Sequence, residues 1–252
     1  YIHDCIEYHH WDLKELGRFI GQTFDLDDEG FFYPNVNADC IDCGLCERVC
    51  PAKNSIKAGD TTQTFVGCLD KDIKRRDEGS SGGVFGLLAS VLISEGYEIC
   101  GAAFDENLRL NHRFADSEES IIGLKKSKYL QSDCHGVYKQ IKQKIKGGKQ
   151  MMFVGTPCQC AALKSYLGEL AAKAVIVDFA CHGVPSQDLF DKCVTYYEQE
   201  HQCKVKSYSF RYKPKRYGSP QNFLLYIQSG TQIVPITGKF YEEPFYCGFQ
   251  KY

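Results

Sequence analysis

The sequence MMFVGTPCQCAALKSYLGELAAKAVIVDFAC, residues 151–181, carries the clearest fold signal in the chain. Residues 151–155 and 174–181 are short, continuous apolar runs, and a helical pattern over residues 159–168 lies between them. Apolar runs of this kind are typical of strands that are covered on both faces. This strand–helix–strand order predicts a layered fold in which helices pack against a sheet.

The same alternation extends upstream of this stretch. Apolar residues recur at helical spacing after residue 83, and this pattern predicts a helix that ends at Gly96. We expect a strand over residues 97–105 and its hairpin partner over residues 109–115. Together these elements predict a mixed sheet in an α/β (α+β) fold.

A further helix is expected before residue 151, with Val137, Ile141 and Ile145 on its buried face. Its predicted caps are Ser132 or Asp133 at the start, and Gly147 and Gly148 in left-handed conformations at the end. Downstream, the pattern predicts a helix over residues 186–201 and strands near residues 204–211, 222–228 and 232–236.

Composition excludes several classes of protein. The chain has 252 residues, of which 43% are hydrophobic, and its net charge of −2 disfavours a nucleic acid partner. No apolar run approaches the roughly 18 residues that cross a bilayer, and the N-terminus has no apolar stretch typical of a signal peptide. These absences lead us to expect a cytoplasmic protein. Fourteen cysteines in a cytoplasmic protein indicate metal binding or catalysis rather than disulfides.

Four cysteines, Cys40, Cys43, Cys46 and Cys50, lie within eleven residues and are followed by Pro51. This spacing is that of bacterial ferredoxins, in which closely spaced thiolates hold a 4Fe–4S cluster. Gly44 relieves crowding where the backbone folds around such a cluster, and backbone amides can donate hydrogen bonds to its sulfurs. Zinc sites more often use two separated pairs of cysteines, so the pattern favours iron and sulfide.

The fourth ligand of this cluster stays open. In a two-cluster ferredoxin the last cysteine of the motif serves the other cluster, but no second motif is present upstream. The ligand could be Cys5, Cys68 or Cys50 after a local rearrangement, or it could be absent, which would leave a three-iron or labile cluster.

A second candidate site is the loop formed by Ser80, Ser81, Gly82 and Gly83, which directly precedes a predicted helix. Such a loop presents backbone amides and hydroxyls at the positive end of the helix dipole, where phosphate groups bind. The alternative is an ordinary helix cap and turn, because serine and glycine are common at both.

Two further polar segments each follow an apolar strand. Thr156, Pro157, Cys158 and Gln159 follow the first strand of the opening stretch, and Cys181 begins the segment CHGVPS after the second. Ligands bind at the carboxyl edge of open α/β sheets, so these residues are candidates for a site. If the two strands are neighbours, Cys158 and Cys181 could share one cluster; the alternative is that each is simply buried.

The basic stretch KSYSFRYKPKRYG, residues 206–218, is a weaker candidate. Arg211 could bind an anionic group such as a pyrophosphate, or the stretch could be a solvated hairpin.

These motifs, in the order GFFYP, CIDCGLCERVCP, SSGGVF, SKYLQSD, FVGTPCQ and CHGVPS, resemble the coenzyme F420 hydrogenase/dehydrogenase beta subunit family with a fused ferredoxin segment. The resemblance spans roughly residues 30 to 250. It implies a ferredoxin-like iron–sulfur segment followed by a flavin-binding α/β domain with a mixed sheet. The expected divisions are a lead-in over residues 1–38, a 4Fe–4S segment over 39–62 and a flavin-binding domain over 63–252.

The resemblance also implies roles for individual residues. The flavin is FAD, and the residues expected to contact it are Ser80, Ser81, Gly82, Gly83, Lys128, Thr156, Pro157 and Gln159. The residues expected to bind clusters are Cys40, Cys43, Cys46 and Cys50 for one, and Cys158 and Cys181 for a second cluster near the flavin.

The chain departs from the family pattern in two places. An upstream ferredoxin motif is missing, and Gly17 stands about where its last cysteine would be. Members of the family also continue beyond EPFYCGFQKY to a cysteine pair that would complete the cluster of Cys158 and Cys181. Either the chain is a fragment, which we expect, or Cys160 and Cys247 substitute, or this cluster is absent.

The expected function is that of an iron–sulfur flavoprotein oxidoreductase that moves electrons between clusters, FAD and a hydride-exchanging substrate such as coenzyme F420. A ferredoxin or a larger catalytic subunit is an expected partner. The alternative is a non-enzymatic electron-transfer or assembly subunit that keeps a cluster but lacks flavin or substrate turnover.

Overall fold

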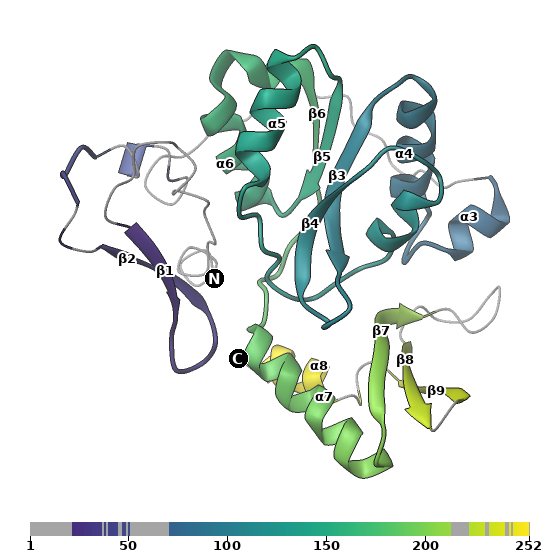
Figure 1. The fold of residues 1–252 in the computed structure, drawn as a ribbon. Helices are drawn as coiled ribbons and strands as arrows, with labels where there is room; N and C mark the ends of the chain where they lie inside the picture. The colour runs from purple at the N-terminus through teal and green to yellow at the C-terminus, as the bar shows by residue number, and fades with distance from the viewer. Residues whose placement is uncertain are drawn as a thin grey trace.

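The structure is a computed structural model, and it describes residues 22–36, 38, 40–44, 47–48, 50, 71–212, 222–229, 232–239, 242 and 244–251. Cys46 and Cys68 therefore lie outside the described residues, as does most of the predicted lead-in. The described residues form three sheets (Figure 1). Among them, no helix has the length and apolar character needed to cross a bilayer.

The central sheet has four strands in the order β4-β3-β5-β6. β3 (Glu98–Phe104) and β4 (Leu110–Ala115) form the predicted antiparallel hairpin. β5 (Met151–Gly155) pairs in parallel with β3 on one side and with β6 (Ala174–Asp178) on the other. The predicted mixed sheet and α/β fold class are therefore confirmed.

Two helices cover one face of this sheet (Figure 1). α5 (Val137–Lys146) and α6 (Pro157–Leu167) bury Ile141 and Leu163 against Phe153 of β5. The predicted helix over 159–168 thus begins two residues earlier, at a proline, which suits the first turn because its missing N–H is not needed there. A short 3-10 helix, Gly168–Lys173, then leads into β6.

α4 (Val84–Ser94) covers the opposite face, together with a 3-10 helix over Ser120–Leu124. Successive side chains of a strand point to opposite faces, so Met152 joins this second core layer while Met151 and Phe153 join the first. α3 (Ile73–Asp77) lies immediately before the glycine-rich loop that enters α4. The result is a sheet with helices on both faces.

The second sheet is antiparallel and consists of β7 (Lys204–Tyr212), β8 (Asn222–Ser229) and β9 (Gln232–Lys239). α7 (Gln187–His201) and α8 (Pro244–Lys251) pack beside it. Phe190 of α7 is fully buried, and its ring centroid lies 5.7 Å from that of Phe104, 5.8 Å from that of Phe210 and 5.4 Å from that of Phe245. Because Phe104 belongs to β3, this aromatic cluster joins the second sheet to the central one.

A hairpin of β1 (Gln22–Leu26) and β2 (Phe32–Val36) lies within the segment predicted as a lead-in. Its turn is fixed by the Asp27 carboxylate, which accepts hydrogen bonds from the backbone N–H groups of Glu29 and Phe31 at 3.0 and 2.8 Å. Gly30 follows with φ +82°, and a Cβ there would overlap the Cβ of Asp188 on α7. The segment predicted as a lead-in therefore contains a hairpin that was not predicted, and its turn-rich letters belong to the hairpin turn.

The predicted cap of α5 by Ser132 or Asp133 was wrong. Gly136, with φ +80°, occupies the cap position, and no side chain caps the helix. Ser132 instead accepts a hydrogen bond from Gln159 Nε2 at 2.9 Å, and Asp133 accepts one from the His135 N–H at 2.7 Å. At the other end, Gly148 is left-handed at φ +86° as predicted, whereas the Gly147 cap has φ −77°.

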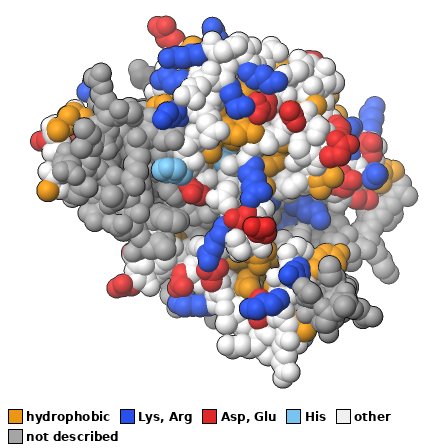
Figure 2. Space-filling view, in the orientation of Figure 1, with side chains coloured by type: hydrophobic (Ala, Val, Ile, Leu, Met, Phe, Trp, Pro, Cys, Tyr) orange, Lys and Arg blue, Asp and Glu red, His pale blue; other side chains and the backbone are white. Residues whose placement is uncertain are grey.

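Charged side chains of both signs are mixed over the face seen in Figure 2, where Lys and Arg are blue and Asp and Glu are red. This pattern agrees with the net charge of −2.

Candidate functional site

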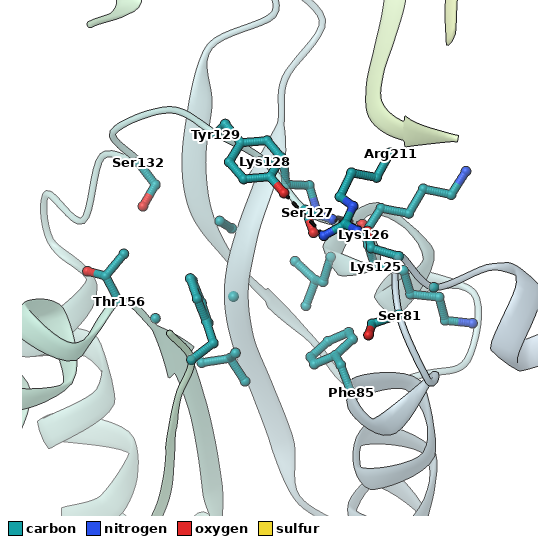
Figure 3. A pocket seen from close by; sticks show the side chains of 18 of the residues that line it. Ser81, Phe85, Lys125, Lys126, Ser127, Lys128, Tyr129, Ser132, Thr156 and Arg211 are labelled. Carbon is teal, nitrogen blue, oxygen red and sulfur yellow. Dashed lines mark hydrogen bonds between the residues drawn. The ribbon is translucent and has the colours of Figure 1, made fainter. Parts of the chain in front are cut away.

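A cavity of about 590 Å³ lies at the carboxyl edge of β3, β5 and β6 (Figure 3). Its volume is in the range of small-molecule and cofactor sites. Four chain segments supply most of its lining, namely 79–86, 124–130, 154–156 and 179–184. Arg75, Gly101, Ala102, Leu110, His112, Ser132, Gln159 and Arg211 complete it.

The structure brings most of the predicted flavin-contacting residues to this one cavity. Those that line it are Ser80, Ser81, Gly82, Gly83, Lys128, Thr156 and Gln159, together with the predicted cluster ligand Cys181. Pro157 and Cys158 are not among the lining residues. Ser81 and Phe85 lie on one side of the cavity and Ser132 and Thr156 on the other (Figure 3).

The glycine-rich loop enters α4 at Gly83, which has φ +82° and makes no side-chain cap. Gly83 has no side chain that could accept hydrogen bonds from the first backbone amides of α4. A helix start that binds an anion needs its first amides to be uncapped in this way. The buried Ser80 hydroxyl accepts a hydrogen bond from the Ser127 N–H at 2.5 Å. This contact ties the glycine-rich loop to the lysine-containing loop opposite.

Five cationic side chains border the cavity, from Arg75, Lys125, Lys126, Lys128 and Arg211. No Asp or Glu is among the described lining residues. Glu78 lies just outside and accepts a hydrogen bond from Lys125 Nζ at 2.6 Å, which forms an ion pair. The cavity is therefore suited to a ligand that carries negative charge.

Lys126 and Lys128 are electrostatically unusual. Burial lowers the pKa of the Lys126 ammonium, although the nearby Glu78 carboxylate opposes the change. Burial, with a smaller contribution from the positive charge of Lys126, lowers the pKa of Lys128 to about 7. Lys126 also has φ +71°, a conformation that a residue with a side chain adopts only when its surroundings hold it there.

Arg211 reaches the cavity from β7 of the second sheet. Its Nη1 donates a hydrogen bond to the Tyr129 hydroxyl at 3.4 Å (Figure 3). The Tyr129 ring packs edge-on against Phe210, with ring centroids 5.6 Å apart. Arg211 thus lines the cavity, and residues 213–218 of the basic stretch lie outside the described residues.

His112 of β4 lies at the floor of the cavity, buried and stacked on Phe153 with ring centroids 5.0 Å apart. Its Nε2 lies 3.0 Å from the Val154 carbonyl oxygen and its Nδ1 lies 3.2 Å from Cys134 Sγ. The pKa of His112 is lowered to about 4, mainly because the ring is buried. The ring is therefore uncharged at neutral pH.

Thr156 and Gln159 form a reciprocal cap at the start of α6. The Gln159 side-chain oxygen accepts from the Thr156 N–H at 3.0 Å, and Thr156 Oγ1 accepts from the Gln159 N–H at 3.5 Å. Thr156 Oγ1 also lies 2.9 Å from Cys158 Sγ. These residues are thus held in place at the cavity wall by the sheet-to-helix turn itself.

The predicted cluster ligands are only partly described. Cys40 and Cys43 are exposed, Cys50 is half-buried and Cys46 lies outside the described residues. The Asp42 N–H donates to Cys40 Sγ at 3.5 Å, and Gly44 has φ +64°, both of which fit a backbone that turns around sulfur atoms.

Cys158 and Cys181 follow neighbouring parallel strands, which meets the condition stated for a shared cluster. Among the described residues, no three Cys, His, Asp or Glu side chains lie close enough together to hold a metal ion. Both cluster sites therefore stay predictions from sequence.

Cys160 is poorly suited to replace a missing cluster ligand. It is buried in the core, its Sγ donates to the Val177 carbonyl at 3.4 Å, and burial raises its pKa to about 12. Cys100 and Cys134 are buried core thiols.

Sequence reasoning missed several residues of the cavity. His112, Lys125, Lys126 and Tyr129 were not singled out, although the charged run KKSK directly after an apolar segment could have indicated Lys125 and Lys126. No local pattern marks His112, because its partners Cys134 and Val154 lie 22 and 42 positions further along the chain.

Residues 148–245 match the model of one protein family, the C terminus of the beta subunit of coenzyme F420 hydrogenase/dehydrogenase. The match covers less than half of the chain, and it confirms the predicted family over this segment, which includes β5, α6, β6 and the second sheet.

Nine chains of solved structures are also similar. One belongs to the xenon-derivatised F420-reducing NiFe hydrogenase complex from Methanosarcina barkeri, with a TM-score of 0.47 and 15% sequence identity over 69% of this chain. The similarity covers 60% of the length of that relative. No curated protein matches the chain.

Proposed function

We propose that this chain, whose residues 148–245 match the F420 hydrogenase/dehydrogenase beta-subunit family, is a subunit of an iron–sulfur flavoprotein oxidoreductase. In this proposal FAD binds in the cavity, and electrons pass between 4Fe–4S clusters, FAD and a hydride-exchanging substrate such as coenzyme F420. The single observation that carries the proposal is the cavity at the carboxyl edge of parallel strands, bordered by a glycine-rich helix start and five cations.

The lining suits a flavin nucleotide at both of its ends. The amides that precede α4, with Lys125 and Arg75 nearby, are suited to the pyrophosphate. Apolar side chains of Leu124 and Val154 suit a flat aromatic ring, and Gly101 leaves room above the sheet because it has no side chain. When bound, FAD would supply the exchange of a hydride on one side and of single electrons on the other.

The protein's own residues would hold the ligand and keep water from it. Thr156 and Gln159 are fixed by the α6 cap, so their positions do not depend on the ligand. His112 is neutral and both of its ring nitrogens have partners, which makes it a positioning residue rather than an acid or base.

The clusters and partners belong to the same proposal. Cys40, Cys43, Cys46 and Cys50 would hold one 4Fe–4S cluster, and Cys158 and Cys181 would contribute to a second. The divisions 1–38, 39–62 and 63–252, a cytoplasmic location and a larger catalytic subunit or a ferredoxin as partner complete it.

A pair of glycine substitutions tests whether the helix start binds the phosphates. Gly83 and Gly96 are both left-handed, at φ +82° and +87°, and stand at the two ends of α4, but only Gly83 lines the cavity. Alanine at either position should cost about 1–2 kcal/mol of stability. Gly83→Ala should also weaken FAD binding about tenfold or more, a loss of about 1.4 kcal/mol, whereas Gly96→Ala should leave it unchanged.

The measurement is FAD titration of the full chain, followed by quenching of flavin fluorescence, with urea unfolding of the same samples. Equal FAD affinity in both variants would contradict the proposed phosphate site. If the wild-type chain binds iron but no FAD, the alternative of an electron-transfer or assembly subunit is favoured.

A further inference from the structure

Gly86 lies inside α4, at a position where the backbone does not require glycine. Its φ is not left-handed, and glycine within a helix is less stable than alanine would be. Gly86 is nevertheless buried and lines the cavity just after Gly83 of the glycine-rich loop. A glycine in this setting indicates that another group comes close to the helix backbone.

The groups that come close are two cationic side chains. A Cβ at position 86 would lie 3.1 Å from Arg75 Cγ and 3.5 Å from Arg75 Cδ, and the first of these distances is too short for relaxed packing. The same Cβ would lie 3.7 Å from Lys125 Cε, which is an ordinary contact. The stems of both side chains therefore lie over the start of α4, and Arg75 occupies the space that a side chain at position 86 would take.

The two cations come from separate parts of the chain. Arg75 belongs to α3, and Lys125 directly follows the 3-10 helix over Ser120–Leu124. Both line the cavity, and Lys125 lies on the same side of it as Ser81 of the glycine-rich loop (Figure 3). Cations beside free backbone amides suit a group with several anionic oxygens, such as a pyrophosphate.

Contacts that need no ligand hold Lys125 over the helix. Its side chain is only 6% exposed, and its Nζ donates to the Glu78 carboxylate at 2.6 Å. Glu78 is the cap residue at the end of α3, so the ion pair ties Lys125 to the helix that carries Arg75. The position of Arg75 relative to Lys125 therefore depends on the space above Gly86.

We propose that Gly86 is a positioning residue for the phosphate end of the ligand. Its missing side chain gives Arg75 room to lie beside Lys125, so that both cations and the amides of the glycine-rich loop bind one pyrophosphate group. Gly86 acts through Arg75 and makes no contact with the phosphates itself. The proposal rests on the proposed function for its ligand, because FAD supplies the pyrophosphate.

FAD titration of the full chain tests this assignment. Gly86→Ala should displace the Arg75 stem and weaken FAD binding about fivefold. Its melting temperature should equal that of the wild type or exceed it by up to about 3 °C, because alanine favours a helix more than glycine does. Gly123→Ala is the matched control and should leave FAD binding unchanged, since Gly123 does not line the cavity and a Cβ there would lie an ordinary 3.7 Å from Ala103.

A double-mutant cycle shows whether Gly86 acts through Arg75. Arg75→Ala alone should weaken FAD binding about tenfold, because one cation is lost. In that background a Cβ at position 86 has no arginine stem to displace, so adding Gly86→Ala should cost less than a further factor of about two. Independent losses, about fiftyfold together, would overturn the proposal.

Riboflavin gives a readout that a purely structural role of Gly86 would not separate from FAD. It has the same ring system as FAD but no phosphate, so Gly86→Ala should bind riboflavin as tightly as the wild type does. An equal loss of affinity for riboflavin and FAD would show that the substitution disturbs the whole cavity, and it would contradict a role at the phosphate end.

Inorganic pyrophosphate separates this proposal from the proposed function. Calorimetric titration of the FAD-free full chain with pyrophosphate should show the same fivefold loss in Gly86→Ala, which is about 1 kcal/mol. If the wild-type chain binds pyrophosphate but not FAD, the proposed function fails, and the pyrophosphate affinities alone decide the role of Gly86. If the wild-type chain binds FAD and Gly86→Ala leaves its affinity unchanged, only the role of Gly86 is refuted. If the wild-type chain binds neither, both proposals fail.

Discussion

The tautomer of His112 follows from its two contacts at the floor of the cavity. The Val154 carbonyl can only accept a hydrogen bond, so Nε2 must carry the hydrogen and Nδ1 must accept one from the Cys134 thiol. Gln159 Nε2 in turn donates to Cys134 Sγ at 3.3 Å. This chain of contacts joins β4 to the end of β5 and to α6, and thereby fixes the shape of the floor.

The lowered pKa of His112 makes stability depend on pH. The unfolded chain binds a proton at His112 near pH 6.5, whereas the folded chain does not until about pH 4. The contribution of this residue to the free energy of unfolding is therefore fully present above about pH 6.5 and is lost as the pH falls toward 4. Between pH 7 and pH 5 the free energy of unfolding should fall by about 2 kcal/mol because of this group.

Urea unfolding at the two pH values measures this loss. In His112→Gln the side chain cannot take up a proton, so this part of the pH dependence should disappear. His135→Gln changes an exposed histidine and should keep it. If the His112→Gln variant shows the same pH dependence as the wild type, His112 is not buried in its neutral form.

Gly155 and Gly101 both line the cavity but should respond differently to alanine. A Cβ at Gly155 would lie 2.8 Å from the Phe153 ring, which is itself packed against His112, so Gly155→Ala should lower the free energy of unfolding by about 1–3 kcal/mol. A Cβ at Gly101 would find its nearest neighbour, Leu124, at an ordinary 3.7 Å, so Gly101→Ala should change it by less than about 0.5 kcal/mol. Equal effects in urea unfolding would show that Phe153 can move aside.

At the scale of single residues, the sequence predicted the parts of the site that depend on local chain geometry. Ser81 and Gly83 could be predicted because a glycine-rich loop before a helix is a local pattern, and Thr156 because it follows an apolar strand. His112 and Arg211 reach the same cavity through long-range pairing, so sequence spacing could not reveal the first and left the role of the second open.

Two helices of the structure begin with side-chain caps of the same kind. Thr156 caps α6 at the cavity wall, and Ser186 caps α7, where its Oγ accepts from the Leu189 N–H at 3.2 Å. Replacement of either by alanine should lower the free energy of unfolding by about 1 kcal/mol. Only Thr156→Ala should also weaken FAD binding, since Ser186 does not line the cavity.

FAD titration together with urea unfolding of the two variants checks this expectation. Thr156→Ser should restore both stability and binding, because serine is an equivalent cap. If Thr156→Ala and Ser186→Ala weakened FAD binding equally, the effect on binding would come from the loss of stability alone.

The secondary-structure elements were predicted best where an apolar period was long and uninterrupted. The strand over 151–155 and the hairpin of β3 and β4 were correct because their apolar residues are buried in the sheet. The predicted cap of α5 was wrong because Ser132 and Asp133 use their side chains for other contacts, which the local sequence does not show.

The hairpin of β1 and β2 had a detectable signal that the sequence reasoning did not use. Two short runs rich in aromatic and β-branched residues flank the turn at Asp27 to Gly30. Pro34 within the second run weakened the strand pattern, but proline is tolerated in a two-stranded sheet because both strands are edges.

At the scale of the whole molecule, the cavity depends on both sheets. The central sheet supplies its floor, and the second sheet supplies Arg211 through β7. The cluster of Phe104, Phe190 and Phe210 holds the two sheets together, with all the ring contacts among the three at 5.7 to 6.2 Å. The family match begins before β5 and ends in α8, so it includes one wall of the cavity but not the glycine-rich loop.

The most direct test of the central claim is an anaerobic absorption spectrum of the purified full chain, before and after dithionite, with released flavin and iron measured on the same sample. The account predicts flavin absorption bands, close to equimolar released FAD, and an iron–sulfur shoulder that dithionite bleaches. Iron without flavin, in protein that also fails to bind added FAD, would contradict the assignment of the cavity as a flavin site and would favour a non-enzymatic electron-transfer subunit.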